Sequence, residues 1–233
     1  MYYKLSNNFV VDDIEDLGCL KFKFPDAFRS KPIIDGSNEE ILPVITDQNE
    51  HKIDFAIWGL LPQDFKEDWS VFQSTGNTLN MHITDVIDDP NYNEVLRNRR
   101  CCILISGFFA SYYSGGEVFP IYVYSSSTPI FTLAAMYNLT NDGFLTTTVL
   151  LKDTNKYMSK LHNVSKRMPI PLSVENMHSW LGEDFRAIAQ NNVDNFSDLD
   201  IKSHSIAKEF YKNNIVYDSI LEPVHYENLS INF

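Results

Sequence analysis

The apolar run Cys101-Cys102-Ile103-Leu104-Ile105 most restricts what this chain can fold into. A strand with one exposed face alternates apolar and polar residues, whereas an uninterrupted apolar run is typical of a strand covered on both faces. The run continues through a serine and a glycine into two phenylalanines. The sequence therefore predicts one buried strand over residues 101–109, with other elements packed on both sides of it.

The rest of the chain predicts a β-rich fold with short helices. Sixteen Phe and twelve Tyr favour strands, and Asn141-Asp142-Gly143 is a turn signal that makes 130–151 a hairpin. Strands are predicted at 2–5, 41–45, 52–57, 101–109, 121–124, 130–136, 144–151 and 201–205. Helices are predicted at 92–97, 156–161, 173–180 (with Ser173 as N-cap) and 184–191, and loops at 35–40, 64–77, 114–117, 125–129 and 190–200.

Composition limits the class of protein. With 233 residues, 44% of them hydrophobic and 21% charged, the chain has ordinary globular composition. No apolar run approaches the roughly 20 residues that span a bilayer, and the N-terminus has no signal-peptide layout. We therefore expect a cytoplasmic protein with no membrane partner. Three Cys make no disulfide framework, and no Cys/His spacing suits zinc, so neither a metal nor a cofactor is expected. A buried structural role is favoured for Cys102 over a displaced nucleophile.

The net charge of −12 is unusual for a nucleic-acid binder, because phosphate neutralisation dominates that kind of affinity. Lysines and arginines nevertheless gather near residues 152–167 and 97–100. They are either a local basic groove on an acidic body or a set of solvated side chains.

Four short segments follow one another along the chain in an order and spacing that match the motifs of a known family. They are Trp58-Gly59-Leu60-Leu61-Pro62, then Leu79-Asn80-Met81-His82, then the segment ending Gly107-Phe108-Phe109, and His162-Asn163-Val164-Ser165-Lys166-Arg167-Met168-Pro169. Together they resemble the motifs of the SOS-response-associated peptidase (SRAP) family of abasic-site processing proteins. The resemblance covers about 42–223 and implies a single α+β domain over 1–233, with a curled, barrel-like mixed sheet and short peripheral helices.

The resemblance also implies a chemistry. In the family the initiator Met is removed, and a Cys at the second position captures the aldehyde of an abasic site in single-stranded DNA as a thiazolidine. An Asn holds that terminus, while a Glu and a His handle protons. This chain keeps Asn80 and His162 as candidate catalytic residues, but it has Tyr2 at the Cys position and Ala110 at the Glu position. Because Tyr2 is large, we expect Met1 to be retained.

These substitutions predict a catalytically degenerate member of a DNA-damage-response family that binds single-stranded or abasic DNA weakly. The candidate DNA-contacting residues are Lys4, His82 (where the family has an Arg), Lys166 and Arg167. Tyr2 would either plug the pocket or stack on a base. Two alternatives stay open: an interaction module whose acidic surface binds a basic protein partner, and a lyase or peptidase that uses His162 or the terminal amine.

Overall fold

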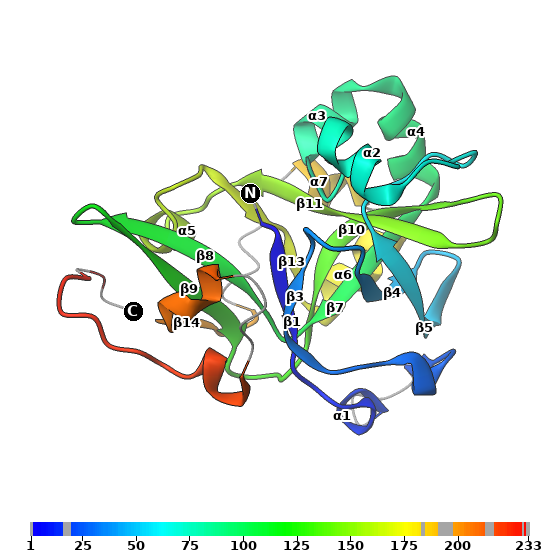
Figure 1. Ribbon diagram of the computed structural model, residues 1–233. Helices are drawn as coiled ribbons and strands as arrows, with labels where there is room; N and C mark the ends of the chain where they lie inside the picture. The colour runs from blue at the N-terminus through cyan, green and yellow to red at the C-terminus, as the bar shows by residue number, and fades with distance from the viewer. Residues whose placement is uncertain are drawn as a thin grey trace.

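The computed structural model describes residues 2–15, 20–182, 185–190, 198–212, 217–229 and 231. Within these residues the chain forms two sheets (Figure 1). The larger has the order β12-β11-β10-β7-β4-β5-β2, and the smaller has the order β14-β9-β8-β1-β3. In Figure 1, β1 runs down the middle of the molecule, with β8 and β9 on one side and the strands of the larger sheet on the other.

The larger sheet closes on itself. Its long strands are β4 (Ile41–Thr46), β5 (Asn49–Trp58), β7 (Arg100–Ile105), β10 (Phe131–Leu139) and β11 (Leu145–Asp153). Neighbours in this set pair antiparallel, and a parallel contact between β5 and β11 joins the two ends into a ring. The short strands β2 (Lys21–Phe22), β6 (Asn80–His82), β12 (Arg167–Pro169) and β13 (Pro171–Leu172) attach to it. The predicted fold class, an α+β fold with a curled, barrel-like sheet, is confirmed.

Strand β7 is buried on both faces, as its composition predicts. Cys101, Ile103 and Ile105 enter one core cluster, and Cys102 and Leu104 enter another. The single strand predicted over 101–109 is wrong, however. The chain turns at Ser106, whose N–H bonds to the carbonyl of Ser6 at 2.8 Å, and continues as β8 (Gly107–Ser114) in the other sheet. An apolar run does not show where a strand changes sheets.

The smaller sheet carries the N-terminal strand. β1 (Lys4–Asn7) lies between β3 (Lys31–Asp35) and β8, and β9 (Glu117–Ser125) and β14 (Ile201–Ser205) complete the sheet. A Cβ on Gly107 would lie 2.4 Å from the ring of Tyr122, so only glycine fits at the start of β8. β1 pairs with β8 only at Leu5–Phe108 and Ser6–Gly107. Beyond Phe108, the edge of β8 that faces away from β9 has no neighbouring strand among the described residues.

Short helices cover the outside. The predicted N-cap of α6 (Val174–Leu181) is confirmed, because Ser173 Oγ accepts from Asn176 N at 3.3 Å. The loop predicted at 64–77 is wrong, since it contains α2 (Trp69–Gly76), which Asp68 caps. The predicted helix at 184–191 and the predicted loop at 190–200 both extend into residues outside the described ranges. The described part of the first contains α7 (Phe185–Gln190). The remaining helices are α1 (Val11–Glu15), α3 (Ile83–Asp88), α4 (Pro90–Asn98), α5 (Met158–Leu161) and three 3₁₀ turns, η1 (Pro25–Ala27), η2 (Lys208–Tyr211) and η3 (Asp218–Leu221).

A buried arginine joins two of these helices. Arg100 is 7% exposed, and its guanidinium donates to carbonyl groups at the C-terminal ends of α4 and α6. The acceptors are the carbonyls of Leu96, Arg97, Trp180, Leu181 and Gly182. The carbonyls at a helix end have no partner inside the helix, and the planar fork of a guanidinium can serve several of them at once.

We expect Arg100→Lys to lower the free energy of unfolding by about 3 kcal/mol, because one ammonium cannot reach both helix ends and buried carbonyls lose their donors. Urea unfolding followed by circular dichroism measures this. Arg97→Lys, an exposed position on α4, is the matched control and should change stability little. Equal stabilities for the two variants would contradict the joining role of Arg100.

Candidate functional site

Tyr2 lies inside the protein. Its side chain is 2% exposed, and its ring centroid is 5.2 Å from that of His162 and 5.8 Å from that of Phe108. The hydroxyl has no hydrogen-bond partner among the described residues. Burial raises the pKa of this hydroxyl far above its ordinary value, so the phenol is neutral at any physiological pH. The position that the motifs assign to a nucleophile therefore holds an inert ring.

Asn80 holds the backbone at Tyr2. It is on β6, which pairs parallel with β11, and its Nδ2 donates to the carbonyl of Tyr2 at 2.8 Å. The preceding carbonyl, that of Leu79, accepts from Trp58 Nε1 at 2.9 Å and from Val149 N at 3.0 Å. β6 is thus fixed from two sides, and Asn80 reaches Tyr2 from a rigid strand.

The Trp58-Gly59 segment builds the support for Asn80. Trp58 is fully buried in the core, so it cannot stack on a base. Gly59 has a φ of +119°, and a Cβ there would lie 2.3 Å from the amide of Gln73. Trp69 lies across this turn and donates from Nε1 to the carbonyl of Trp58 at 3.0 Å. The Trp58-Gly59 segment therefore has a structural role, because it helps to fix the strand that carries Asn80.

His162 follows α5 and bonds to the edge of β8. Its Nδ1 lies 2.9 Å from the carbonyl oxygen of Ser111 and 3.1 Å from the nitrogen of the same residue. Either a protonated Nδ1 donates to the carbonyl or an unprotonated one accepts from the N–H. Asn163 makes the same kind of contact two residues further along β8. It accepts from Tyr113 N at 2.7 Å and donates to Tyr113 O at 2.8 Å.

These two side chains take the place of a missing strand. Beyond Phe108 the edge of β8 has no partner in β1, and an unpaired strand edge needs hydrogen-bond partners. His162 and Asn163 supply them at alternate residues, Ser111 and Tyr113. The sequence gives no sign of this role, since it does not show which strand the two side chains meet.

The environment of His162 favours the neutral imidazole. Burial lowers its pKa below the ordinary value, and the hydrogen bond to Ser111 opposes this only in part. Its Nε2 is buried with no partner among the described residues. Ala110, which is 1% exposed, precedes Ser111 and shares with Phe108 the face of β8 that packs in the main core. No carboxylate therefore stands at this position to exchange a proton with His162.

The four predicted DNA-contacting residues do not all gather. His82 and Arg167 lie on β6 and β12, on either side of β11, and Lys166 precedes Arg167. Acidic groups are close by, with Asp153 at 3.5 Å from His82 and Asp85 at 4.0 Å from Arg167. The side chains of Arg167 and Asp85 are each more than half exposed, so this ion pair contributes little to stability.

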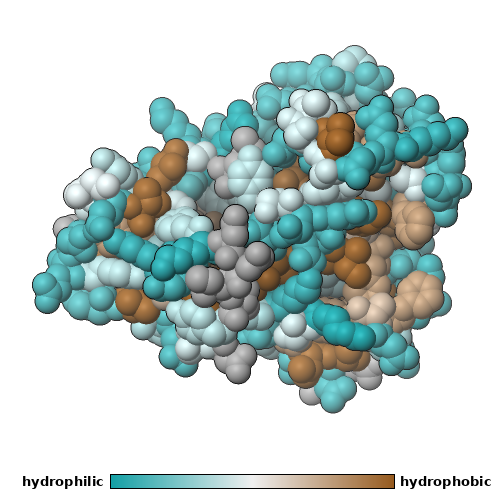
Figure 2. Space-filling model, viewed as in Figure 1, coloured by the Kyte–Doolittle hydropathy of each residue, from teal (hydrophilic) through white to brown (hydrophobic). Residues whose placement is uncertain are grey.

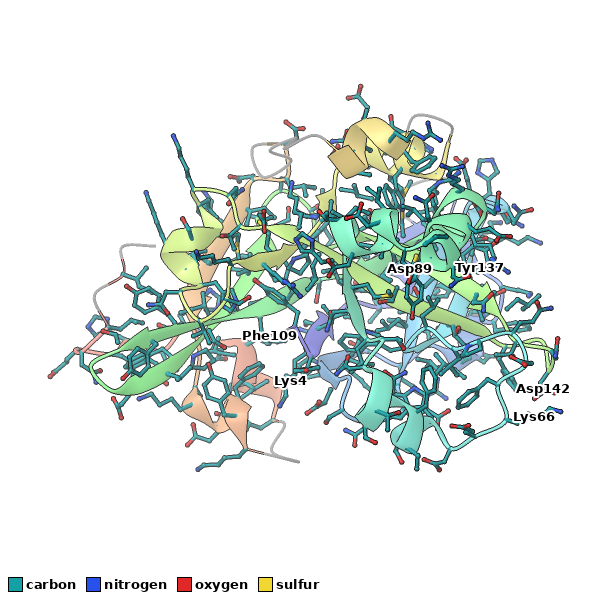
Figure 3. The ribbon with its side chains drawn as sticks, turned by 90° about the horizontal axis from the view of Figure 1, so that it is seen from above. Lys4, Lys66, Asp89, Phe109, Tyr137 and Asp142 are labelled. Atoms are coloured by element: carbon teal, nitrogen blue, oxygen red, sulfur yellow. The ribbon has the colours of Figure 1, made fainter. Side chains whose placement is uncertain are left out.

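Lys4 is engaged elsewhere. Its Nζ lies 3.2 Å from Asp35 and donates to the carbonyl of Phe210 at 3.0 Å. Burial opposes the ionised form of Asp35, but hydrogen bonds from Ser37 and Lys4 hold its pKa below the ordinary value. In Figure 3, Lys4 lies close to Phe109 near the middle of the molecule. Its charge is therefore offset inside the protein.

A groove of about 480 Å³ runs beside the start of β1, between α2 and η2. Three aromatic residues, Tyr3, Trp69 and Tyr211, are among its walls, and its charged residues are the paired Lys4 and Asp35. The groove has aromatic surface without net positive charge. Neither Tyr2 nor His162 lines it, and both side chains are buried.

The thiols are unsuited to act as nucleophiles. Cys101 and Cys102 are fully buried, and burial raises the pKa of Cys101 to about 12 and that of Cys102 well above its ordinary value. The structural role predicted for Cys102 is confirmed, whereas Cys19 lies outside the described residues. Within the described ranges no three His, Cys, Asp or Glu side chains converge as metal ligands, and no helix is long and apolar enough to cross a membrane.

The structure combines a closed, curled sheet with a second residue that is held between an Asn and a His. Comparison with solved structures shows which proteins share this fold. A protein from Bacteroides thetaiotaomicron has the same fold, with a TM-score of 0.79 at 20% identity, over 96% of this chain and 100% of its own. A protein from Bordetella bronchiseptica matches with a TM-score of 0.71 at 12% identity, over 88% and 99%. A phage-related protein from the same organism matches with a TM-score of 0.58 at 10% identity, over 88% and 94%.

The family description "SOS response associated peptidase (SRAP)" matches residues 16–212, and the chain belongs to this family. No curated protein matches it. The resemblance carried by the four sequence motifs is confirmed, and the chain is a SRAP protein of the DNA-damage response.

Tyr2→Phe should leave the free energy of unfolding unchanged or raise it by about 1 kcal/mol, because a buried hydroxyl without a partner costs stability. Thermal and urea unfolding measure the change. Tyr3→Phe is the matched control, since the Tyr3 hydroxyl accepts from Asn77 at 3.3 Å near the surface. A loss of more than about 1 kcal/mol on Tyr2→Phe would show that the hydroxyl has a partner, such as an internal water.

Proposed function

We propose that this chain is a SRAP protein that has lost the family's covalent capture of abasic sites and keeps weak binding of single-stranded DNA. His162 and Asn80 are the retained positions of the ancestral site, while Tyr2 and Ala110 occupy the positions of the lost nucleophile and acid. The physiological role would then be recognition, in the DNA-damage response, without formation of a stable adduct.

The observation that carries the proposal is the burial of Tyr2 against His162. A thiazolidine needs a thiol beside the terminal amine, and a neutral phenol cannot replace it. The ring also covers the imidazole that would move the proton. Of the two roles considered for Tyr2, plugging the pocket agrees with an exposure of 2%, whereas stacking on a base would need an accessible face.

The charge distribution supports weak binding. Lys166 and Arg167 are exposed beside His82, but Asp85 and Asp153 lie among them. The whole chain carries −12, which opposes the approach of a polyanion at long range. The His82 side chain is only 12% exposed, which leaves Lys166 and Arg167 as the accessible contacts for phosphate.

The wild-type protein should form no heat-stable adduct with a single-stranded oligonucleotide that carries one abasic site. A denaturing gel after incubation, with and without borohydride, measures this. An adduct that is stable without borohydride would contradict the proposal. An adduct trapped only by borohydride would indicate an amine-dependent lyase through a Schiff base, at a terminus that lies outside the described residues.

The double variant Tyr2→Cys/Ala110→Glu tests whether the remaining site is the ancestral one. A small second residue permits removal of Met1, and Asn80 and His162 already contact position 2. We expect this variant to form the stable adduct, and the same variant carrying His162→Gln to form it more slowly. A folded double variant that forms no adduct would show that the retained residues no longer make a usable site.

Single-strand binding should be weak and should fall as the salt concentration rises. Two phosphate contacts give a slope of log K against log salt of about −1.4, at roughly −0.7 per contact for single strands. Lys166→Ala/Arg167→Ala should remove most of this slope, whereas Lys52→Ala, an exposed change on β5, should not. Fluorescence anisotropy of a labelled oligonucleotide measures it. Tight binding that resists salt would contradict this assignment.

A further inference from the structure

A second cavity lies away from Tyr2 and His162. It has a volume of about 660 Å³ and lies between α6, the turn before β10 and the start of β5. Its apolar wall comes from buried side chains of the larger sheet, of α6 and of the segment that precedes β14. They are Leu104, Ile130, Phe131, Leu172, Met177 and Leu199.

The lip of this cavity is apolar on one side. Val174, the first residue of α6, lines the cavity and is 73% exposed, which makes it the most exposed large apolar side chain that the structure describes. Scattered single apolar residues are normal on a surface, but one that adjoins a large apolar cavity extends a continuous patch. Apolar patches rimmed by polar residues are typical of protein-binding sites.

The polar groups within the wall are already used by the fold. Thr132 Oγ1 donates to the carbonyl of Leu172 at 3.5 Å, and Ser173 Oγ caps α6 by accepting from Asn176 N. Small-molecule sites place a few polar groups deep inside to orient the ligand. This cavity offers an apolar interior instead, which suits an apolar side chain whose orientation is fixed from outside.

The rim is acidic. Glu50 and Glu175 lie at the mouth, and no lysine or arginine is among the described residues that line the cavity. His178 Nδ1 lies 3.1 Å from Glu50 Oε2, which links α6 to the start of β5 across the opening. Carboxylates at the rim repel anionic ligands and attract cationic ones, and the net charge of −12 acts in the same direction.

We propose that this cavity is a docking site for a basic protein segment that inserts an apolar side chain, leucine or phenylalanine in size, while its lysines or arginines pair with Glu50 and Glu175. An apolar anchor in a pocket with a charged rim is the usual arrangement of a binding hot spot. The site is distinct from the proposed DNA site, because Tyr2, Asn80 and His162 do not line the cavity, although Phe131 and Leu199 in its wall belong to the same core cluster as Tyr2.

Methyl-labelled protein titrated with the blocked peptide Lys-Arg-Leu-Phe-Lys-Arg tests the proposal by NMR. The methyl resonances of Met177 and Ile130, both in the cavity wall, should shift, and that of Met158, which is buried and does not line the cavity, should not. Matched peptides with Ser-Ser at the centre, or with Glu at every basic position, should bind at least about tenfold more weakly.

Charge reversal at the rim is the second arm. Glu50→Lys/Glu175→Lys should weaken binding of the basic peptide about tenfold and strengthen binding of the acidic one. Asp142→Lys/Glu117→Lys makes the same change of charge at exposed positions outside the cavity and should have no effect. Asp142 lies beyond the far end of β10, next to Lys66 in Figure 3.

Several outcomes would overturn the proposal. They are shifts confined to residues outside the cavity wall, equal affinity for the basic and acidic peptides, and binding that the rim variant leaves unchanged. Unfolding curves for both double variants establish that any loss comes from the rim and not from misfolding.

Discussion

The free edge of β8 is the constraint on which the site depends. β1 pairs with only two residues of that strand, and the backbone beyond them needs other partners. The side chains of His162 and Asn163 bond to Ser111 and Tyr113 as a neighbouring strand would. Because the histidine has this structural use, the motif can outlast the chemistry with which it is associated.

The interior beside this edge shows why Ala110 and Tyr2 suit each other. A glutamate at 110 would place a carboxylate in an interior lined by Phe108 and Tyr2, which is costly unless it is paired. With alanine there, an uncharged ring at position 2 can pack against the imidazole. The result is a dry, neutral arrangement in which the pKa of His162 is lowered and the Tyr2 hydroxyl stays protonated. Neither group then needs a counter-charge.

The view in Figure 2 agrees with a body whose polar groups lie outside, since the face is mostly hydrophilic, with its largest apolar patch on the side of β4 and β5.

Local signals predicted the fold well where one interaction decides the element. The two-sided burial of β7, the cap at Ser173 and the hairpin around Asn141–Gly143 follow from apolar periodicity and turn chemistry. The change of sheet at Ser106 and the helix at Trp69–Gly76 were missed. The first depends on a long-range bond to Ser6, and the second on tertiary packing of Trp69 against the Gly59 turn. The candidate residues Asn80, His162 and Ala110 came from the resemblance of the motifs to the SRAP family. The edge contacts of Asn163 and the helix-joining role of Arg100 depend on partners that no local pattern shows.

The position of Tyr2 also affects how the chain matures. Asn80 bonds to Tyr2 across 78 residues, and His162 lies about twice as far along the chain. During synthesis at about 5–20 residues per second, the N-terminal segment waits on the order of ten seconds before its last partners exist. Until then β1 can pair with β3, but the ring of Tyr2 lacks the histidine against which it packs. The final closure of the N-terminus therefore comes late, and a nascent chain that stalls before residue 162 cannot bury its own beginning.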